Sequence, residues 1–176
     1  MDHRTVESRR VYDGKLLRVD RDRVRLPNGR ETDLEIIRHP GASAVVPFVT
    51  PDEVLLVRQL RYATGGYILE VPAGTLEPGE APEACAGREI VEEVGHRAGR
   101  LEALGSIYTT PGFTDEVIHL WAAHDLQPAA QDLEHDEILT VERMAFDRAL
   151  ELVRSGGIRD GKTVCALLLA REARNG

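Results

Sequence analysis

In residues 4–38, apolar side chains such as Val6, Val11, Leu16, Val19, Val24 and Leu26 are set among many charged ones. This spacing favours exposed antiparallel strands with one buried face, so residues 4–38 are predicted to form strands. A turn is predicted at residues 26–30 (LPNGR), because Asn28 and Gly29 tolerate positive φ. The pattern predicts an N-terminal β subdomain over residues 1–40, which is thin for independent stability.

After residue 41 the apolar residues come in longer runs. Residues 42–50 (ASAVVPFVT) are typical of a buried strand, and residues 53–60 (EVLLVRQL) are expected to return as its partner. Further strands are predicted at 68–71, 101–109, 117–123 and 138–144. Loops are predicted at 61–67 and 126–136.

Helical spacing predicts two helices near the end of the chain. Residues 146–155 carry apolar side chains at helical intervals and stop at Gly156. Asp160 is predicted to cap a second helix that runs to about Ala173. Because strands and helices do not alternate regularly, the chain is predicted to be α+β, with a mixed sheet between helices over residues 41–176.

The composition is that of a globular protein, with 42% hydrophobic and 30% charged residues among 176. A net charge of −8 argues against a nucleic-acid binder, because such proteins present basic patches to phosphates. Cys85 and Cys165 imply no disulfide framework and fit a reducing cytoplasm. No apolar run is expected to act as a signal peptide or a membrane span.

Residues 74–96 concentrate the candidate chemistry. On a helix, Glu89, Glu92 and Glu93 share one face, while Ile90 and Val94 lie on another side that is able to pack into a core. Three carboxylates on one rigid face suit hard cations such as Mg²⁺ or Mn²⁺. The alternative is an amphipathic helix whose acidic face is merely solvated.

The glycine loop before this helix and the order of its charged residues resemble the Nudix box. The residues at the required spacing are Gly74, Glu80, Arg88, Glu89, Ile90, Glu92, Glu93 and Gly95. His96 departs from the pattern, which has an aliphatic residue there. The resemblance implies an α/β/α sandwich and favours a metal-dependent hydrolase over the solvated helix.

Four further segments resemble the ADP-ribose pyrophosphatase branch of this family. They are VRQLR (57–61), PGFTDE (111–116), the pair Asp136-Glu137, and GIRDGKT (157–163), together with the N-terminal strand region. Together they extend the resemblance over most of the chain.

The resemblance implies a metal site and a structural ion pair. Glu89 and Glu93 are expected to hold the metal ions, with Glu92 sharing them and the carbonyl of Ala73 completing the shell. Glu80 and Arg88 match the ion pair that locks the loop onto the helix in this family.

The family often takes a catalytic carboxylate from the place that the acidic segment 132–137 occupies here. Glu137 is the first candidate for orienting or deprotonating the attacking water, and Glu134 is the second. The alternative is that this segment is a solvated run of charges.

Candidate substrate ligands lie outside the box. Arg61, and less strongly Arg58, present guanidinium groups suited to a diphosphate, although arginines at the end of a sheet are ordinarily just solvated. In the family, the residue matching Glu116 is thought to bind ribose hydroxyls; the alternative is a turn residue facing solvent. Phe113 either stacks on the substrate or anchors its loop.

The base-binding region is matched only in its general location. In the family an aromatic residue near the N-terminal strands, sometimes from the neighbouring subunit, sandwiches adenine. Tyr12 lies in about that region, and Arg38 lies at the end of the third predicted strand.

The predicted function is Mg²⁺-dependent hydrolysis of the diphosphate of ADP-ribose to AMP and ribose 5-phosphate. The resemblance also implies a small nucleotide-sugar as substrate. A homodimer with swapped N-terminal strands is predicted, because these strands have little core of their own and resemble the swapped subdomain of the family. The cysteines fit a cytoplasmic protein, and the charge and the lack of an apolar span argue against nucleic acid and membranes as partners. Other diphosphate substrates remain alternatives, GDP-mannose first among them. A nucleotide-sugar sensor that binds without cleaving is an alternative of another class.

Overall fold

The computed structural model describes residues 3–133 and 137–175. The chain divides into two compact units. The first comprises residues 1–41 together with 108–117, and the second comprises 42–107 and 118–176.

The first unit is built on a three-stranded antiparallel sheet. Its strands are β1 (Arg4–Asp13), β2 (Arg18–Arg25) and β3 (Glu31–Arg38), in the order β1-β2-β3. Gly29 adopts a φ of 80° and donates its N–H to the Leu26 carbonyl at 2.9 Å. The strands and the turn predicted from the sequence are therefore confirmed.

Charged contacts, more than apolar packing, hold the first unit together. Among its described residues, Val24 is the buried hydrophobic side chain. Residues 108–117 attach to β3, because the Ile37 N–H donates to the Phe113 carbonyl at 2.8 Å and the Asp115 N–H donates to Ile37 at 3.2 Å. The sequence pattern had grouped that segment with residues 41–176.

The second unit contains a mixed seven-stranded sheet. Its strands are β4 (Ala42–Thr50), β5 (Glu53–Arg61), β6 (Gly66–Glu70), β7 (Ala73–Thr75), β9 (Arg100–Tyr108), β10 (Val117–His124) and β12 (Leu139–Ala145). The main order is β12-β5-β4-β10-β9, with β6 paired to β5 and β7 paired to β4. Strand β4 is parallel to β10 and antiparallel to β5. A separate ribbon joins β8 (His96–Arg97) to β11 (Gln127–Pro128).

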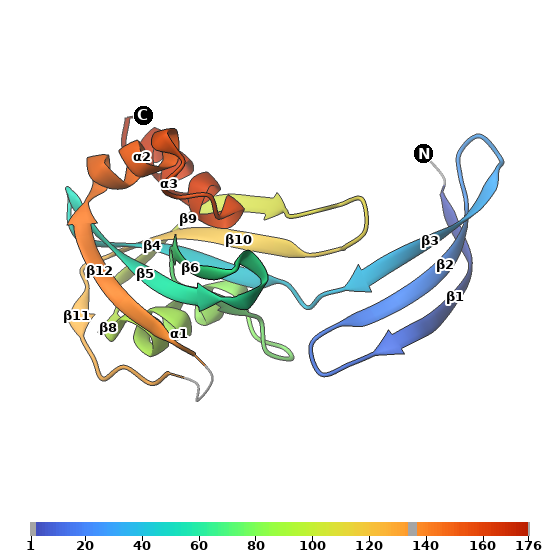
Figure 1. The fold of residues 1–176 in the computed structure, drawn as a ribbon, viewed down its shortest axis with the longest axis horizontal. Helices are drawn as coiled ribbons and strands as arrows, with labels where there is room; N and C mark the ends of the chain where they lie inside the picture. The colour runs from blue at the N-terminus through green and yellow to red at the C-terminus, as the bar shows by residue number, and fades with distance from the viewer. Residues whose placement is uncertain (1–2, 134–136, 176) are drawn as a thin grey trace. The chain divides into compact units, whose positions relative to one another are not determined.

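Helices cover both faces of this sheet. Helix α1 (Pro82–Val94) lies on one face, and α2 (Phe146–Ser155) and α3 (Gly161–Asn175) lie on the other (Figure 1). Because side chains alternate along a strand, Val45 of β4 packs with α1, while Ala44 and Val46 pack with α2 and α3. The predicted α/β/α sandwich is confirmed. Within residues 3–133 and 137–175, no helix is long and apolar enough to cross a membrane.

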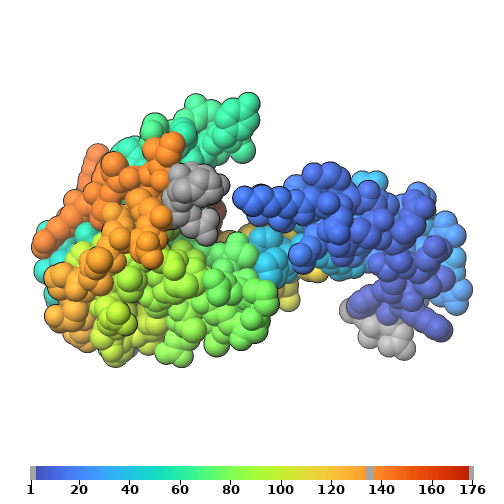
Figure 2. Space-filling view, turned by 90° about the horizontal axis from the view of Figure 1, so that it is seen from below, coloured from blue at the N-terminus to red at the C-terminus, as the bar shows by residue number. Residues whose placement is uncertain are grey.

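The predicted loop at residues 61–67 is instead a tight hairpin. Strand β5 continues to Arg61, a 3₁₀ turn spans Tyr62–Thr64, and β6 begins at Gly66. Gly65 closes the turn with a φ of 80°. This hairpin projects from the surface of the second unit (Figure 2), and Tyr62 is 97% exposed. The short strands β7, β8 and β11 were also not predicted, because two or three residues carry no periodic pattern.

Candidate active site

Helix α1 is fixed at both ends and along its apolar side. It begins with Pro82, whose missing N–H is not needed at a first helical position, and it ends at Gly95 with a φ of 63°. Ile90 and Val94 pack with Val45 of the sheet. The side of the helix that carries the charged residues is therefore held in a defined position.

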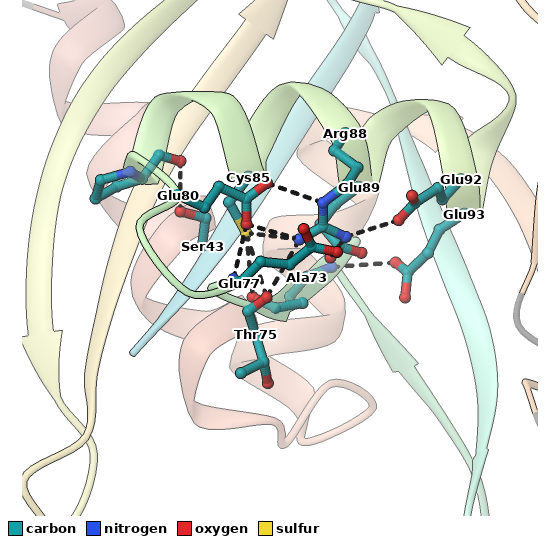
Figure 3. A network of polar contacts seen from close by, with 12 residues as sticks. Ser43, Ala73, Thr75, Glu77, Glu80, Cys85, Arg88, Glu89, Glu92 and Glu93 are labelled. Carbon is teal, nitrogen blue, oxygen red and sulfur yellow. Dashed lines mark hydrogen bonds and ion pairs between the residues drawn. The ribbon is translucent and has the colours of Figure 1, made fainter. Parts of the chain in front are cut away.

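Arg88 is the centre of a polar network on that side (Figure 3). Its Nε and Nη2 atoms donate to the two oxygens of Glu80 at 2.9 and 3.0 Å. Its Nη1 atom donates to Glu89 at 2.6 Å and to Glu92 at 2.8 Å, and Nη2 also reaches the Thr75 carbonyl at 3.2 Å. The hydrogen bonds from Arg88 lower the pKa of Glu80 to about 2. The ion pair expected between Glu80 and Arg88 is confirmed.

Two carboxylates of the network are buried. Glu89 is 5% exposed and Glu93 is 2% exposed. Burial raises the pKa of Glu89 to about 7 in spite of Arg88, and burial together with the charge of Glu89 raises the pKa of Glu93 to about 8. The Ala73 N–H donates to Glu93 at 3.1 Å. The structure thus keeps two acidic groups where their charges are poorly solvated.

Gly74 allows the loop to approach the helix closely. A Cβ atom added at this position would lie 1.8 Å from Oε1 of Glu89. No larger residue fits there without moving that carboxylate. The motif therefore has glycine at this position because the Glu89 side chain occupies the space that a Cβ atom would fill.

The segment before β12 is tied to the carboxyl end of α1. The Ala129 N–H donates to the Gly95 carbonyl at 2.8 Å, the Asp132 N–H donates to the Glu92 carbonyl at 3.2 Å, and the Gln131 amide donates to the Glu93 carbonyl. Further along this segment, the charge of Glu137 is one of the minor causes, after burial, that raise the pKa of Glu89 and Glu93. Glu137 therefore lies near these carboxylates, whereas Glu134, the second candidate, lies outside the described residues.

The two candidate arginines of β5 are held differently. Arg61 donates from Nε at 3.0 Å to Glu70, and its charge slightly opposes the rise in the pKa of Glu93 that burial causes. Arg58 pairs with Glu142 on the neighbouring strand β12, where Nη2 lies 3.2 Å from the carboxylate. The structure therefore brings Arg61, but not Arg58, into electrostatic contact with the acidic face of α1.

The other candidate substrate ligands belong to the first unit. Tyr12 is 57% exposed, and Phe113 is also exposed while its backbone is bonded to β3. Arg38 is paired with Asp20, Asp22 and Asp115. Glu116 accepts a hydrogen bond from the Thr109 hydroxyl at 2.7 Å. Their roles in substrate binding stay predictions.

The donor set suits a divalent cation, although the side chains are not gathered around one point. Among the described residues, no group of three or more His, Cys, Asp or Glu side chains is arranged to hold a metal ion. Arg88 bridges Glu89 and Glu92, and the Ala73 N–H holds Glu93. Hard oxygen donors, among them two buried carboxylates whose charge is poorly solvated, are nevertheless the ligands that Mg²⁺ and Mn²⁺ prefer. The predicted ligands Ala73, Glu89, Glu92 and Glu93 therefore fit a metal chemically.

Sequence patterns missed several residues of this site. The Gln131 side chain donates to the Glu93 carbonyl at the end of α1, and residue spacing in the sequence does not predict such a long-range contact. Cys85 is buried, and burial raises the pKa of its thiol to about 11, so it is an unreactive part of the network. Glu70 had a readable signal, because it is a charged residue inside the apolar strand segment Ile68–Val71.

Two family models match the chain. Residues 38–167 match the model described as NUDIX domain. Residues 4–34 match the model described as nucleoside diphosphate sugar hydrolase N-terminal domain. Together the two models cover most of the second unit and most of the three strands of the first.

Curated relatives and a solved structure are similar over most of the chain. A methanol dehydrogenase activator of Bacillus methanolicus is 38% identical, and the match covers 94% of this chain and 91% of the relative. An ADP-ribose pyrophosphatase of Bacillus subtilis (strain 168) is 36% identical over 95% of this chain and 91% of the relative. A GDP-mannose pyrophosphatase of Salmonella paratyphi B is 40% identical over 76% and 78%. The crystal structure of an ADP compounds hydrolase, 26% identical, matches with a TM-score of 0.89 over 100% of this chain and 96% of that one.

Proposed function

The chain belongs to the NUDIX domain family, and we propose that it hydrolyses the diphosphate of ADP-ribose to AMP and ribose 5-phosphate with Mg²⁺ or Mn²⁺. The observation that carries this proposal is that two buried carboxylates, Glu89 and Glu93, lie on one face of α1, near the charges of Arg61 and Glu137. Two of the relatives act, by their names, on ADP-ribose and GDP-mannose, and the similar structure acts on ADP compounds. The names of the two relatives support a nucleotide-sugar diphosphate as substrate, and the name of the similar structure supports an ADP derivative.

Nudix hydrolases generally use divalent metal ions. In the proposed reaction Glu89 and Glu93 would hold the metal, with Glu92 and the Ala73 carbonyl as further ligands. When bound, the metal neutralises the charge of the diphosphate and lowers the pKa of the attacking water.

The remaining residues of the site position Glu89, bind the diphosphate or activate the attacking water. Arg88 and Glu80 keep the loop on the helix, so that Glu89 stays where its ligand role requires it. Arg61 lies where its guanidinium is able to bind a diphosphate oxygen, since its charge already acts on Glu93. Glu137 orients the attacking water or accepts its proton.

GDP-mannose is the second candidate substrate. The GDP-mannose pyrophosphatase among the relatives supports it, because that protein is 40% identical over 76% of this chain. ADP-ribose and GDP-mannose contain the same diphosphate, so an enzyme would distinguish them by its contacts with the base and the sugar. The sequence assigned those contacts to residues whose roles stay predictions.

Comparison of kcat/KM across diphosphates tests the proposed substrate. ADP-ribose, GDP-mannose, NADH, diadenosine polyphosphates and dNTPs are each assayed with Mg²⁺ under identical conditions. We expect ADP-ribose to have the highest kcat/KM. Preference for another diphosphate would reject ADP-ribose as the substrate while keeping the chemistry of α1. Tight binding of one ligand without turnover would instead identify a sensor.

Replacing Gly74 by alanine is expected to displace Glu89, because the added Cβ would stand 1.8 Å from its Oε1 atom. A shift of about 1 Å in a ligand costs on the order of a hundredfold in rate, so kcat/KM should fall by about that factor. Gly66→Ala is the matched control, because nothing lies within 4 Å of a Cβ there. A Gly74→Ala variant with wild-type kcat/KM would disprove the role given to this contact.

We further propose that the chain forms a homodimer through its N-terminal strands. Support comes from β1, which is exposed along its whole length, and from the exposed apolar side chains Val6 and Val11 on it. Light scattering after size exclusion is expected to give twice the chain mass of 19.5 kDa. A monomer mass at micromolar concentration would refute it. Strand swapping and a cytoplasmic location stay predictions from the sequence.

A further inference from the structure

A buried ionic cluster beside the site joins the end of β5, the end of β6 and the start of α3. The Glu70 side chain at the end of β6 is only 3% exposed. Arg61 binds one of its oxygens, Oε2, through Nε at 3.0 Å and Nη2 at 2.8 Å. Lys162 binds the other oxygen, Oε1, through Nζ at 3.0 Å. Each oxygen of one buried carboxylate thus has its own cation.

Lys162 is itself held in place by the first turn of α3. Its side chain is 13% exposed and its Nζ also lies 3.0 Å from Asp160. Asp160 caps α3 by accepting from the Thr163 N–H at 3.0 Å and from its hydroxyl at 2.6 Å. Burial opposes ionisation of Asp160, yet the charge of Lys162 and the Thr163 hydroxyl keep its pKa below the ordinary value. The Lys162 ammonium is therefore a fixed charge and not a mobile surface group.

The same helix turn also holds the backbone that enters the site. The Thr163 hydroxyl is fully buried and accepts a hydrogen bond from the Val71 N–H at 2.9 Å. Val71 stands two residues before Ala73, whose N–H binds Glu93. The carboxyl end of β6 is thus bonded to the start of α3 twice, through the ion pair of Glu70 with Lys162 and through the backbone N–H of Val71, the next residue, to Thr163.

Removal of the Lys162 charge would change the geometry of the ion pair between Arg61 and Glu70. Oε1 would lose its cation in a place with little water, and Arg61 would be left to compensate the buried charge of Glu70 without Lys162. A carboxylate paired with one guanidinium alone favours a bidentate pair, in which each carboxylate oxygen accepts its own N–H. Arg61 would then be drawn across both oxygens of Glu70 and turned from its present position relative to Glu93.

We propose that Lys162 is a positioning residue of this enzyme: by occupying one oxygen of Glu70, it keeps Arg61 on the other, where Arg61 is able to bind the substrate diphosphate. Lys162 touches neither the substrate nor the carboxylates of α1. The inference rests on the proposed function, because it assigns Arg61 to the diphosphate. It gives a role to the segment 157–163, which the proposed reaction otherwise leaves unused.

Steady-state kinetics of Lys162→Met with ADP-ribose provide the test. KM is expected to rise about tenfold while kcat changes less than about threefold, because diphosphate binding is disturbed and the carboxylates of α1 are not. Lys162→Arg keeps the cation and should return KM to within about threefold of wild type. Arg171→Met is the matched control on the same helix, since Arg171 pairs only with exposed Glu172 among the described residues, and it should leave both constants unchanged.

A double variant separates positioning from general support of α3. If Lys162 acts through Glu70, adding Lys162→Met to Glu70→Gln should cause no further rise in KM. The comparison of Glu70→Gln with the double variant can still be made if Lys162→Met alone does not fold, because neither of these two variants contains the Glu70 carboxylate. Wild-type KM in Lys162→Met, or a further rise of KM in the double variant, would overturn the positioning role alone. A wild-type protein that leaves ADP-ribose intact would overturn the proposed function, and this inference with it.

Discussion

Glu93→Gln is expected to lower kcat by about a thousandfold or more while the protein stays folded. Glu93 is buried and proposed as a metal ligand, and a metal supplies several kcal/mol of stabilisation to the developing charge, at about 1.4 kcal/mol per tenfold in rate. Glutamine has nearly the same shape, so packing is preserved. The measurement is Mg²⁺-dependent turnover of ADP-ribose by the purified variant.

Thermal unfolding of the same variant gives a readout independent of activity. Burial, with the charge of Glu89, raises the pKa of Glu93 to about 8 from the ordinary 4.5. Such a group destabilises the fold increasingly as pH rises from about 4.5 to 8, because the folded protein resists its ionisation. Without metal, Glu93→Gln should therefore be at least as stable as wild type at pH 8, and the difference should shrink towards pH 5. Mg²⁺ should raise the Tm of wild type but not of the variant.

The control for both measurements is Glu83→Gln on the same helix. Glu83 is an exposed carboxylate in the first turn of α1, so its loss changes the helix dipole interaction only by a few tenths of a kcal/mol. Its turnover and its response to Mg²⁺ should match wild type. Wild-type turnover in Glu93→Gln would remove this residue from the metal site.

Glu137→Gln is the second variant with a large expected effect. General base residues contribute about 10²–10⁴ in rate, so kcat should fall by that factor. KM and the Mg²⁺-dependent rise in Tm should remain close to wild type, because Glu137 is not among the proposed metal ligands.

Two comparisons decide whether Glu137 is the right residue. Glu134→Gln tests the second candidate from the sequence, which lies outside the described residues. Asp132→Asn serves as the control, because Asp132 contributes its backbone N–H to the Glu92 carbonyl and that contact survives the change. A hundredfold loss in Glu134→Gln with normal turnover in Glu137→Gln would transfer the role to Glu134.

Helix α1 and the ion pair between Arg88 and Glu80 were predictable, because the residues that define them lie close together in the sequence. The fixed spacing of Arg88, Glu89 and Glu93 places them on one face of any helix, and Gly95 marks its end. Glu80 stands eight residues before Arg88, a separation that a single loop spans. Strand alternation and helical spacing likewise gave the layers of the sandwich.

The partners of the outlying residues were not predictable, because they depend on pairing between distant segments. Alternation along β5 could not reveal that Arg58 faces Glu142, which is 84 residues away on β12. The bonds from Lys162 to Glu70 and from Val71 to Thr163 each join residues 92 apart. In the first unit, Arg38 was read as a candidate ligand, whereas the fold surrounds it with three aspartates.

Release of AMP and ribose 5-phosphate from ADP-ribose, measured with Mg²⁺ and with EDTA, tests the proposed reaction most directly. We predict equal amounts of the two products with Mg²⁺ and neither with EDTA, with turnover restored when Mg²⁺ is returned in excess. Products that continue to form in EDTA would contradict the metal role of the α1 carboxylates. ADP-ribose that stays intact with Mg²⁺ would contradict the proposed function itself.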